Sequence, residues 1–390
     1  MRCVPRFEPF PALRYREDVD LNVVTSPPYD VIDAAERERL AASTAYNAVH
    51  VDLPSDYDDA AGLLRRWEDE GVLVTDDEPS FYVYRMGYTD EAGRARQSTG
   101  VLGALELQVP GEGDVLPHEH TTPKAKSDRL ALTRATKANL SPIWGLSLAS
   151  GLTGLADVPG PPVGRATDEH GVHHRLWRVT APAVVDAISA LVASSPVVIA
   201  DGHHRYETAL QYRDEVGPGT PADLTLALVV ELTESELAVR PIHRLLRGLG
   251  GADVVEALSS VFEPFEATGA DETLPAQMDD AGALGLVLPD GSAWLLRPRD
   301  GAFPADLPDL DSSRLDVARA ALGDHEVEYQ HGTDIVLRRV AAGEADAGVL
   351  LRPATVAQIQ ATAHARDRMP PKTTYFYPKP RTGFVFRRLG

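Results

Sequence analysis

The sequence predicts an α+β fold with a mixed, mostly antiparallel sheet and flanking helices. Helical patterns and strand-like apolar runs are mixed along all 390 residues. Two pairs of strand-like runs flank turn sequences, at 89–93 and at Asp290-Gly291, which is typical of antiparallel hairpins. The 31 glycines and 30 prolines favour many short elements.

The individual elements follow from local patterns. Helical spacing predicts helices at 34–42 and 58–70, and the second places Leu63, Leu64 and Trp67 on one face. The sequence NAVHVDLP, at 47–54, lies between them and predicts a strand. Further along, a helix is predicted at 182–192, hairpins at 80–107 and 285–298, and single strands at 171–180, 196–200 and 224–232.

Composition divides the chain into three segments. Residues 1–248 are expected to form the main α+β domain. Residues 249–310 are acidic and rich in glycine and proline, which predicts an insertion that carries the second hairpin. Residues 311–390 alternate helix and strand patterns, and they are expected to return to the main domain.

The overall composition excludes several classes of protein. No apolar run approaches the roughly 18 residues that span a bilayer, and no signal-peptide core is present, so no membrane partner is expected. Cys3 is the only cysteine, so an intrachain disulfide is excluded and a cytoplasmic location is the simplest. The net charge of −20 argues against general nucleic-acid binding. The sequence leaves the oligomeric state undetermined.

The first polar cluster lies in ADGHHRYETAL, at 200–210, between an apolar run and a helical pattern. A helix N-terminus offers unpaired N–H groups and a positive dipole end, which together form an anion site. Gly202 permits a tight turn, and Arg205 can bind a phosphate through two hydrogen bonds. His203 and His204 can donate hydrogen bonds or exchange protons near pH 7. The alternative is a helix cap followed by surface histidines.

Asp201 is the unexpected member of this cluster, because a carboxylate repels a bare phosphate. A carboxylate beside a phosphate site is explained if it binds Mg²⁺ or accepts a proton from a hydroxyl nucleophile. We therefore expect Asp201 to be both a catalytic residue and the metal ligand.

A second cluster lies at 116–143. His118 and His120 would share one face of a strand, with Glu119 opposite, and this spacing can ligate a metal. Five basic residues against one acid give a charge of +4 over 124–137, which predicts a site for an anionic ligand; they are Lys124, Lys126, Arg129, Arg134 and Lys137. A solvated helix face explains the same pattern.

Two further stretches combine stiff backbone with aromatic and charged residues. In TSPPYDVID, at 25–33, two prolines precede Tyr29 and Asp30. This pattern fits either the wall of a ligand-binding pocket or a structural turn. In RDRMPPKTTYFYPKPR, at 366–381, basic residues that include Lys372 are interleaved with aromatics. This segment predicts either a basic strand that reaches the anion site or a surface strand.

The turn at 200–210 resembles the phosphate-binding box of the ParB/sulfiredoxin superfamily, whose free-serine kinases carry a closely similar Asp-Gly-His-His-Arg. This resemblance implies a phosphate-binding strand-turn-helix in which Gly202, His203, His204 and Arg205 contact nucleotide phosphates. The whole chain resembles the domain-of-unknown-function family numbered 1015 through PPYDVI, HEHT, ADGHHRYETAL and MPPKTTYFYPK. Members of that family often accompany serine-biosynthesis enzymes, which implies a role in phosphoserine metabolism.

Together these features predict a phosphoryl-transfer enzyme, a kinase with an alcohol-group acceptor. The expected partners are a nucleotide, ATP or ADP with Mg²⁺, and a small-molecule substrate, free serine. The absence of a G-x-x-x-x-G-K-[ST] sequence excludes a P-loop kinase. The residues expected to bind phosphate outside the turn are Lys124, Lys126 and Arg129, and those expected to bind substrate are Tyr29, Asp30, His118, His120 and Lys372.

The catalytic base is less well defined by the sequence. The resemblance implies a glutamate from a separate loop, for which Glu119 is the first candidate, Asp30 is the second and Asp201 is a further acceptor. His203 and Arg205 are expected to stabilise the transferring phosphoryl group. Three alternatives remain: a phosphoserine phosphatase, a zinc-dependent hydrolase that uses His118, His120 and His203 or His204, and a nucleotide-binding regulatory module without turnover.

Overall fold

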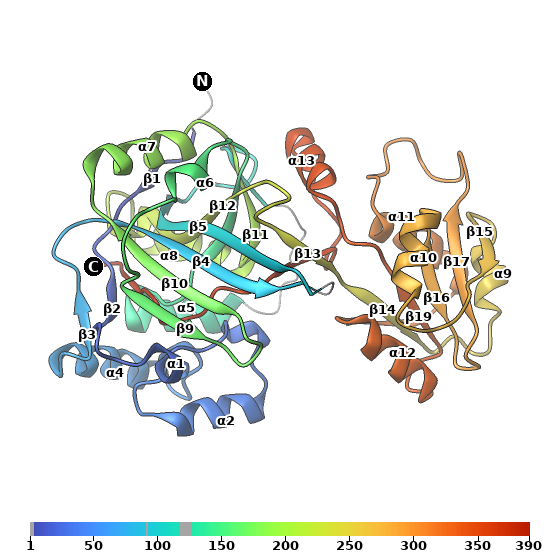
Figure 1. Cartoon of the computed structure of the whole chain (residues 1–390), viewed down its shortest axis with the longest axis horizontal. Coiled ribbons are helices and arrows are strands. Elements are labelled where there is room, and N and C mark those ends of the chain that lie inside the picture. Colours follow the sequence, from blue (N-terminus) through green and yellow to red (C-terminus); the bar gives the residue numbers. More distant parts are fainter. Residues whose placement is uncertain (1–3, 91–92, 118–125) are drawn as a thin grey trace. The chain divides into compact units, whose positions relative to one another are not determined.

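The computed structural model describes residues 4–90, 93–117 and 126–390, with the side chains of residues 126 and 127 excepted. The chain forms two compact units. Unit 1 contains the chain up to Ala238 together with Pro378–Gly390, and unit 2 contains Val239–Tyr377. Figure 1 labels many of the elements of both units. No helix among these residues is long and apolar enough to cross a bilayer.

The described part of unit 1 is built on a nine-stranded sheet. Its strands are β1 (Phe7–Glu8), β4 (Phe81–Thr89), β5 (Ala95–Glu106), β6 (Val115–Pro117), β8 (Ile143–Ser147), β9 (Gly164–Thr167), β10 (His173–Val179), β11 (Val197–Asp201) and β12 (Leu224–Glu231). They lie in the order β6-β11-β8-β12-β5-β4-β10-β9, and β1 also pairs with β5. The β6–β11 and β8–β12 pairs are parallel and the others antiparallel. The fold is therefore α+β with a mixed, mostly antiparallel sheet, as predicted.

Helices flank this sheet. They are α1 (Leu21–Val24), α2 (Ala34–Ser43), α3 (Val49–Asp52), α4 (Tyr57–Asp69), α5 (Lys126–Thr136), α6 (Leu152–Leu155), α7 (Pro182–Val192) and α8 (His203–Val216). Side chains of α7 and α8, such as Ile188 and Tyr206, share a buried apolar cluster with Val83 and Trp177 of the sheet. Burial of this cluster is the main driving force for packing the helices on the strands.

The sequence prediction was wrong at NAVHVDLP, which forms the short helix α3 instead of a strand. A strand that buries Val49 and Val51 on one face would turn Asp52 to the other face, but all three side chains are buried. The Asn47 side chain accepts a hydrogen bond from Val49 N at 2.9 Å and so starts a helical turn. This local hydrogen bond favours the helical turn over the strand that the period-two pattern predicted.

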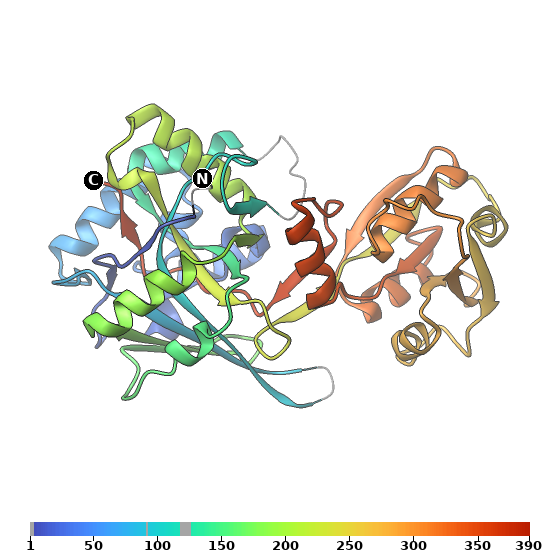
Figure 2. The same ribbon diagram turned by 90° about the horizontal axis from the view of Figure 1, so that it is seen from above.

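Two small sheets join distant parts of unit 1. One pairs β2 (Leu13–Tyr15) with β3 (Leu73–Thr75), and the other pairs β7 (Ala138–Asn139) with β21 (Arg387–Arg388). Leu13 also bridges to Phe386, and Ser26 bridges to Thr382. In Figures 1 and 2 the red C-terminal segment accordingly runs beside N-terminal elements of this unit. The C-terminal residues are thus an integral part of unit 1.

Unit 2 contains a six-stranded antiparallel sheet in the order β15-β17-β16-β19-β14-β18. These strands are β14 (His243–Arg247), β15 (Phe262–Glu266), β16 (Leu284–Val287), β17 (Ala293–Pro298), β18 (Glu326–Gln330) and β19 (Ala347–Leu350). β13 (Ala238–Pro241) pairs separately with β20 (Thr374–Tyr377). The helices are α9 (Val254–Leu258), α10 (Leu274–Ala281), α11 (Asp311–Ala318), α12 (Thr333–Ala341) and α13 (Val356–Ala365), and a 3₁₀ turn spans Arg319–Leu322.

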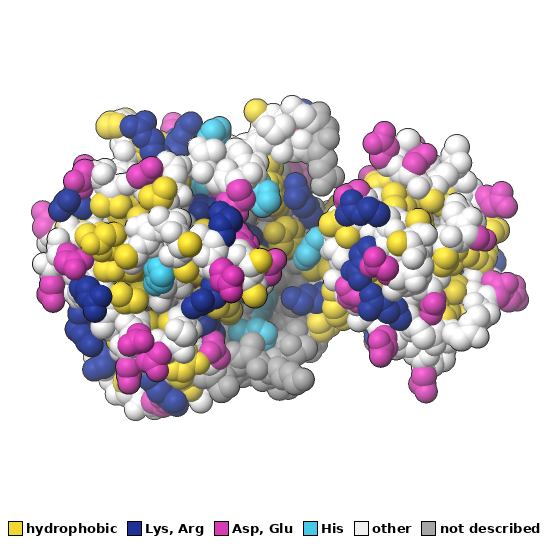
Figure 3. Space-filling model, turned by 90° about the horizontal axis from the view of Figure 1, so that it is seen from below, with side chains coloured by type: hydrophobic (Ala, Val, Ile, Leu, Met, Phe, Trp, Pro, Cys, Tyr) yellow, Lys and Arg dark blue, Asp and Glu magenta, His cyan; other side chains and the backbone are white. Residues whose placement is uncertain are grey.

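The sheet of unit 2 combines residues that the sequence assigned to separate segments. β15, β16 and β17 come from 249–310, whereas β18 and β19 come from 311–377. The hydrogen-bonded pairing of β16 with β19 joins the two groups into one sheet. Figure 3 shows acidic and basic side chains interspersed over the viewed face of each unit.

Candidate active site

The strand-turn-helix at 196–212 begins with a buried strand. Residues 197–200 of β11 are buried, and α8 starts at His203 and buries Tyr206, Ala209 and Tyr212. Gly202 joins the two elements with φ 85° and ψ 29°, a left-handed conformation that glycine adopts without strain. This geometry brings together the side chains of Asp201, at the end of the strand, and Arg205, in the first turn of the helix.

Asp201 binds two cations at this turn. Its Oδ2 accepts a hydrogen bond from Arg205 Nη2 at 2.7 Å, and its Oδ1 forms an ion pair with Lys379 Nζ. The exposed fractions of the side chains are 19% for Asp201, 10% for Arg205 and 11% for Lys379. Asp201, Arg205 and Lys379, hereafter the charge cluster, thus form a partly buried group with a net charge of +1 at neutral pH.

The charge of Asp201 is stabilised by its neighbours. Burial raises the pKa of this carboxyl, but the Lys379 ammonium and the Arg205 guanidinium lower it more, so the net pKa lies well below its usual value. For Arg205, burial lowers the pKa and the charges of Asp201 and Asp30 raise it, with a net upward shift. Asp201 and Arg205 are therefore both ionised near pH 7.

The proline-containing loop contributes to the same site. Tyr29 and Asp30 lie in a 3₁₀ turn, Tyr29–Val31, and the Tyr29 ring lies 5.9 Å from Arg205 Cζ and 4.2 Å from Arg129 Cζ. Asp30 is exposed and its charge acts on Arg205. Two hydrogen bonds between the backbones of Ser26 and Thr382, at 2.9 and 3.1 Å, tie this loop to the segment that carries Lys379.

Beneath Tyr29 lies a buried ion pair that the sequence reasoning missed. Arg129 Nη1 lies 3.4 Å from Asp52 Oδ1 and donates to Asp52 O at 2.6 Å, and Thr382 donates to Asp52 Oδ2 at 3.2 Å. Burial raises the pKa of Asp52, and the charges of Arg129 and Arg205 oppose this shift. The only available signal was an acid inside the misassigned NAVHVDLP.

A cavity of about 50 Å³ adjoins the charge cluster and is lined in part by Tyr29, Asp52, Arg129, Arg205 and Thr208. Within the described residues, Arg205 Nε and Thr208 Oγ1 are buried without a hydrogen-bond partner. Arg205 thus keeps one buried donor available while its other nitrogens hold Asp201 and the backbone carbonyl of Pro142. An oxygen of an anionic ligand would satisfy that donor.

The other predicted site residues divide into three groups. His203 and His204 lie half-buried in the first turn of α8, beside the charge cluster. Lys372 belongs to unit 2, where its backbone oxygen accepts a hydrogen bond from Arg244. The predictions for Lys124, His118, Glu119 and His120 fall outside the described residues, and Lys126 begins α5 with its side chain outside the description.

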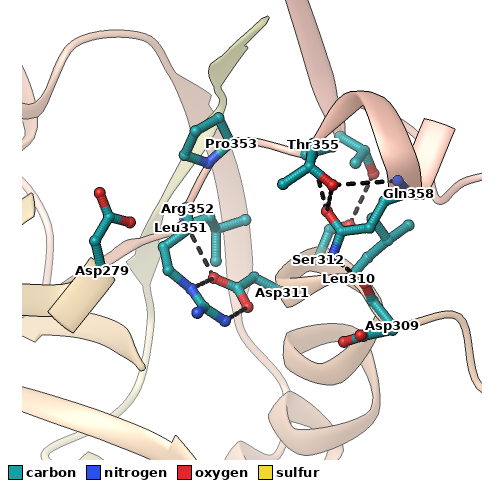
Figure 4. Close-up of a pocket in the computed structure, with 12 residues that line it drawn as sticks. Asp279, Asp309, Leu310, Asp311, Ser312, Leu351, Arg352, Pro353, Thr355 and Gln358 are labelled. Carbon is teal, nitrogen blue, oxygen red and sulfur yellow. Dashed lines mark hydrogen bonds and ion pairs between the residues drawn. The ribbon is translucent and has the colours of Figure 1, made fainter. Parts of the chain in front are cut away.

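Unit 2 has a pocket of its own, of about 290 Å³. Figure 4 shows Asp311 and Arg352 facing each other in its wall, and their closest approach is 2.6 Å. Asp279 and Asp309 also line it. Because Arg352 is already paired and carboxylates surround it, this pocket disfavours a phosphate, and we place the candidate anion site in unit 1.

Replacement of Gly202 by alanine tests the geometry of the turn. A Cβ at this position would lie 3.0 Å from both Cζ and Nε of Arg205, on a backbone with φ 85°. We expect the free energy of unfolding to fall by about 1–2 kcal/mol from the left-handed strain, together with weaker nucleotide binding. Gly219→Ala is the control, because its φ is 81° but nothing lies within 4 Å of a Cβ. Equal nucleotide affinity in the two variants would contradict a role for the turn.

Replacement of Asp201 by asparagine tests the charge cluster through pH. The folded pKa lies below the unfolded value of about 3.9, so the ion pairs stabilise the fold above about pH 4 and this contribution disappears as the pH falls. We expect Asp201→Asn to cost about 3–5 kcal/mol at pH 7 in urea unfolding, with a difference from wild type that narrows towards pH 3. Asp186→Asn, at an exposed position on α7, should change stability by under about 0.5 kcal/mol. A difference from wild type independent of pH would refute this assignment.

Several solved structures resemble this chain at low sequence identity. No curated protein matches the chain. A structure described as free serine kinase in complex with AMP is 14% identical, covers 77% of this chain and 94% of its own, and has a TM-score of 0.40. A conserved hypothetical protein from Pyrococcus furiosus is 14% identical, with coverage of 70% and 90% and a TM-score of 0.38. C-terminally truncated SbnI from Staphylococcus aureus is 14% identical, with coverage of 73% and 85% and a TM-score of 0.40.

One family model matches most of the sequence. It covers residues 7–318, from β1 through α11, and so includes the turn at Gly202, the proline-containing loop and most of unit 2. The charge cluster extends beyond the match, because Lys379 lies after its end. The chain belongs to the family described as protein of unknown function, DUF1015.

Proposed function

We propose that this protein is a nucleotide-dependent kinase that transfers a phosphoryl group to the hydroxyl of a small metabolite, free serine. The charge cluster is the single observation that carries the proposal. It joins a partly buried carboxylate, two cations and a helix N-terminus at the end of a buried strand. Fixed positive charge at a helix N-terminus is suited to the phosphates of a nucleotide and to the charge that develops during their transfer.

In this proposal the turn binds the phosphates. Arg205 and Lys379 contact phosphate oxygens, while Asp201 holds both cations in place. Gly202, His203 and His204 are assigned to the same phosphates, and Lys124 and Lys126 remain predicted phosphate contacts. Arg129 is buried and paired with Asp52 and Asp128, so it fits a supporting role better than direct contact with a phosphate. Tyr29, Asp30, His118 and His120 are assigned to the acceptor, and Lys372 remains a prediction.

The transfer step needs a proton acceptor. The serine hydroxyl oxygen forms a bond to the terminal phosphorus, the bond from that phosphorus to the leaving nucleotide breaks, and the hydroxyl proton passes to a carboxylate. The lowered pKa of Asp201 makes it a poor base, because efficient bases have a pKa near the working pH. We therefore assign the base to Glu119 or Asp30 and assign Asp201 to positioning Arg205 and Lys379.

In this proposal Mg²⁺ binds together with the nucleotide. Both carboxylate oxygens of Asp201 already face cations, so Asp201 fits poorly as a ligand of a resident Mg²⁺. Among the described residues, no group of three or more His, Cys, Asp or Glu side chains could hold a metal. The zinc alternative depends on His118 and His120, which lie outside those residues, and stays a prediction.

The decisive experiment is a turnover panel on the purified full chain. Serine with ATP or with ADP, each with Mg²⁺, is expected to yield phosphoserine, measured by mass spectrometry. Release of phosphate from phosphoserine without nucleotide would indicate the phosphatase instead. Nucleotide binding without turnover of any hydroxyl substrate would indicate a regulatory module and would overturn the proposed kinase.

A further inference from the structure

Three arginines lie side by side across one edge of the unit 1 sheet. Arg175 of β10 is directly opposite Arg165 of β9 and directly opposite Arg85 of β4. Residues directly opposite on neighbouring strands point to the same face of a sheet, so the three side chains form one row. Figure 1 shows β9 at this edge, next to β10.

This row is unfavourable for the fold by itself. Like charges directly opposite each other destabilise a sheet. Arg85 is compensated, because it donates to Ala156 O at 2.8 Å, pairs with Asp157 at 3.3 Å and lies 4.7 Å from the centre of the Trp177 ring. Arg165 and Arg175 are exposed and, within the described residues, have no side-chain hydrogen bond or ion pair. Although the net charge of the protein is −20, no acid of its described part is paired with either of these two guanidinium groups.

A pocket of about 360 Å³ lies at the same place. Besides Arg165 and Arg175, its wall includes Thr167 and His173, which are hydrogen-bonded to each other at 3.0 Å, and Trp177. The Trp177 indole is fixed by a hydrogen bond to Gly160 O at 2.9 Å. No carboxylate is among the described residues that line this pocket.

We propose that this pocket, hereafter the β9–β10 pocket, is a second anion site that binds the phosphate group of a small molecule. Two adjacent guanidinium forks match the oxygens of a phosphate, which can accept two hydrogen bonds from each. His173 supplies a further donor, and the bound anion removes the repulsion within the arginine row. This second site does not depend on the proposed kinase activity, because none of the residues of the β9–β10 pocket belongs to the charge cluster.

The test titrates inorganic pyrophosphate into the full chain by calorimetry, in an Arg205→Ala background that excludes binding at the charge cluster. Saturable binding is expected, and Arg165→Gln/Arg175→Gln should weaken it at least about tenfold, the loss of one good charge-assisted contact. Arg65→Gln/Arg66→Gln is the matched control, because it removes two exposed arginines of α4 and the same net charge. Its affinity should change less than about twofold, since screened distant charges contribute little.

Thermal unfolding provides an independent readout. Without ligand, Arg175→Gln should leave the midpoint unchanged or raise it, because a like-charge contact is removed. Pyrophosphate should raise the midpoint of the Arg205→Ala protein and have no such effect after the Arg165/Arg175 double substitution. Absence of saturable binding, equal losses in both double variants, or a lower midpoint for ligand-free Arg175→Gln would each overturn the second anion site.

Discussion

Replacement of Arg205 by alanine is expected to lower turnover by about 10²–10³-fold, the usual effect of removing one donor that stabilises developing charge. Arg205 contacts Asp201 and lies over Tyr29, and within the described residues its buried Nε has no hydrogen-bond partner, so its loss removes a donor from the centre of the proposed site. Nucleotide affinity should fall with turnover. Both are measured on the same protein, turnover by phosphoserine formation and affinity by calorimetry.

The control for this variant is Arg213→Ala. Arg213 lies on the same helix, and its Nη1 donates to Leu107 O at 2.9 Å, away from Asp201. This variant removes one positive charge from α8 and leaves the ion pairs of the charge cluster intact, so the affinity for nucleotide should change less than about twofold. If Arg205→Ala folds and binds nucleotide as tightly as Arg213→Ala does, the turn at Gly202 does not bind phosphate.

Local patterns made much of unit 1 predictable. The helix predicted at 182–192 matches α7, and the aromatic alternation of the first hairpin forms β4 and β5. Such elements depend on residues within a few positions of one another, which the sequence displays directly. NAVHVDLP was predicted wrongly because burial there does not alternate, since Val49, Val51 and Asp52 are all buried. Asp52 is held inside by Arg129 and Thr382, which are distant in sequence.

The same distinction explains what could be predicted of the site. Asp201 and Arg205 are four residues apart across a strand-to-helix turn, so their proximity follows from local structure. Lys379 joins Asp201 from 178 residues away, and it does so because Thr382 bridges to Ser26 and β21 pairs with β7. The basic segment at 366–381 indicated a cation for the site. It could not indicate which cation, because choosing Lys379 over Lys372 requires the boundary between the two units.

Replacement of Glu119 by glutamine is expected to lower kcat by about 10²–10⁴-fold with nucleotide affinity unchanged, if Glu119 is the base. The substitution keeps the size of the side chain and removes its ability to accept a proton. Asp30→Asn is the paired variant, because Asp30 is the other carboxylate assigned to proton transfer and its charge acts on Arg205. For Asp30→Asn we expect mainly a higher KM for serine.

The roles of Glu119 and Asp30 can be distinguished by the kinetic constant that each variant changes. A base acts only in the transition state, so its loss lowers kcat and removes the acidic limb of the pH profile, whereas loss of a substrate contact raises KM and keeps that limb. A large fall in kcat for Asp30→Asn, with full activity of Glu119→Gln, would transfer the role of base to Asp30. Asp201→Asn should differ from both, because disruption of the charge cluster weakens nucleotide binding and stability together. Full kcat in both Glu119→Gln and Asp30→Asn would leave the proposed transfer without its proton acceptor and would refute this mechanism.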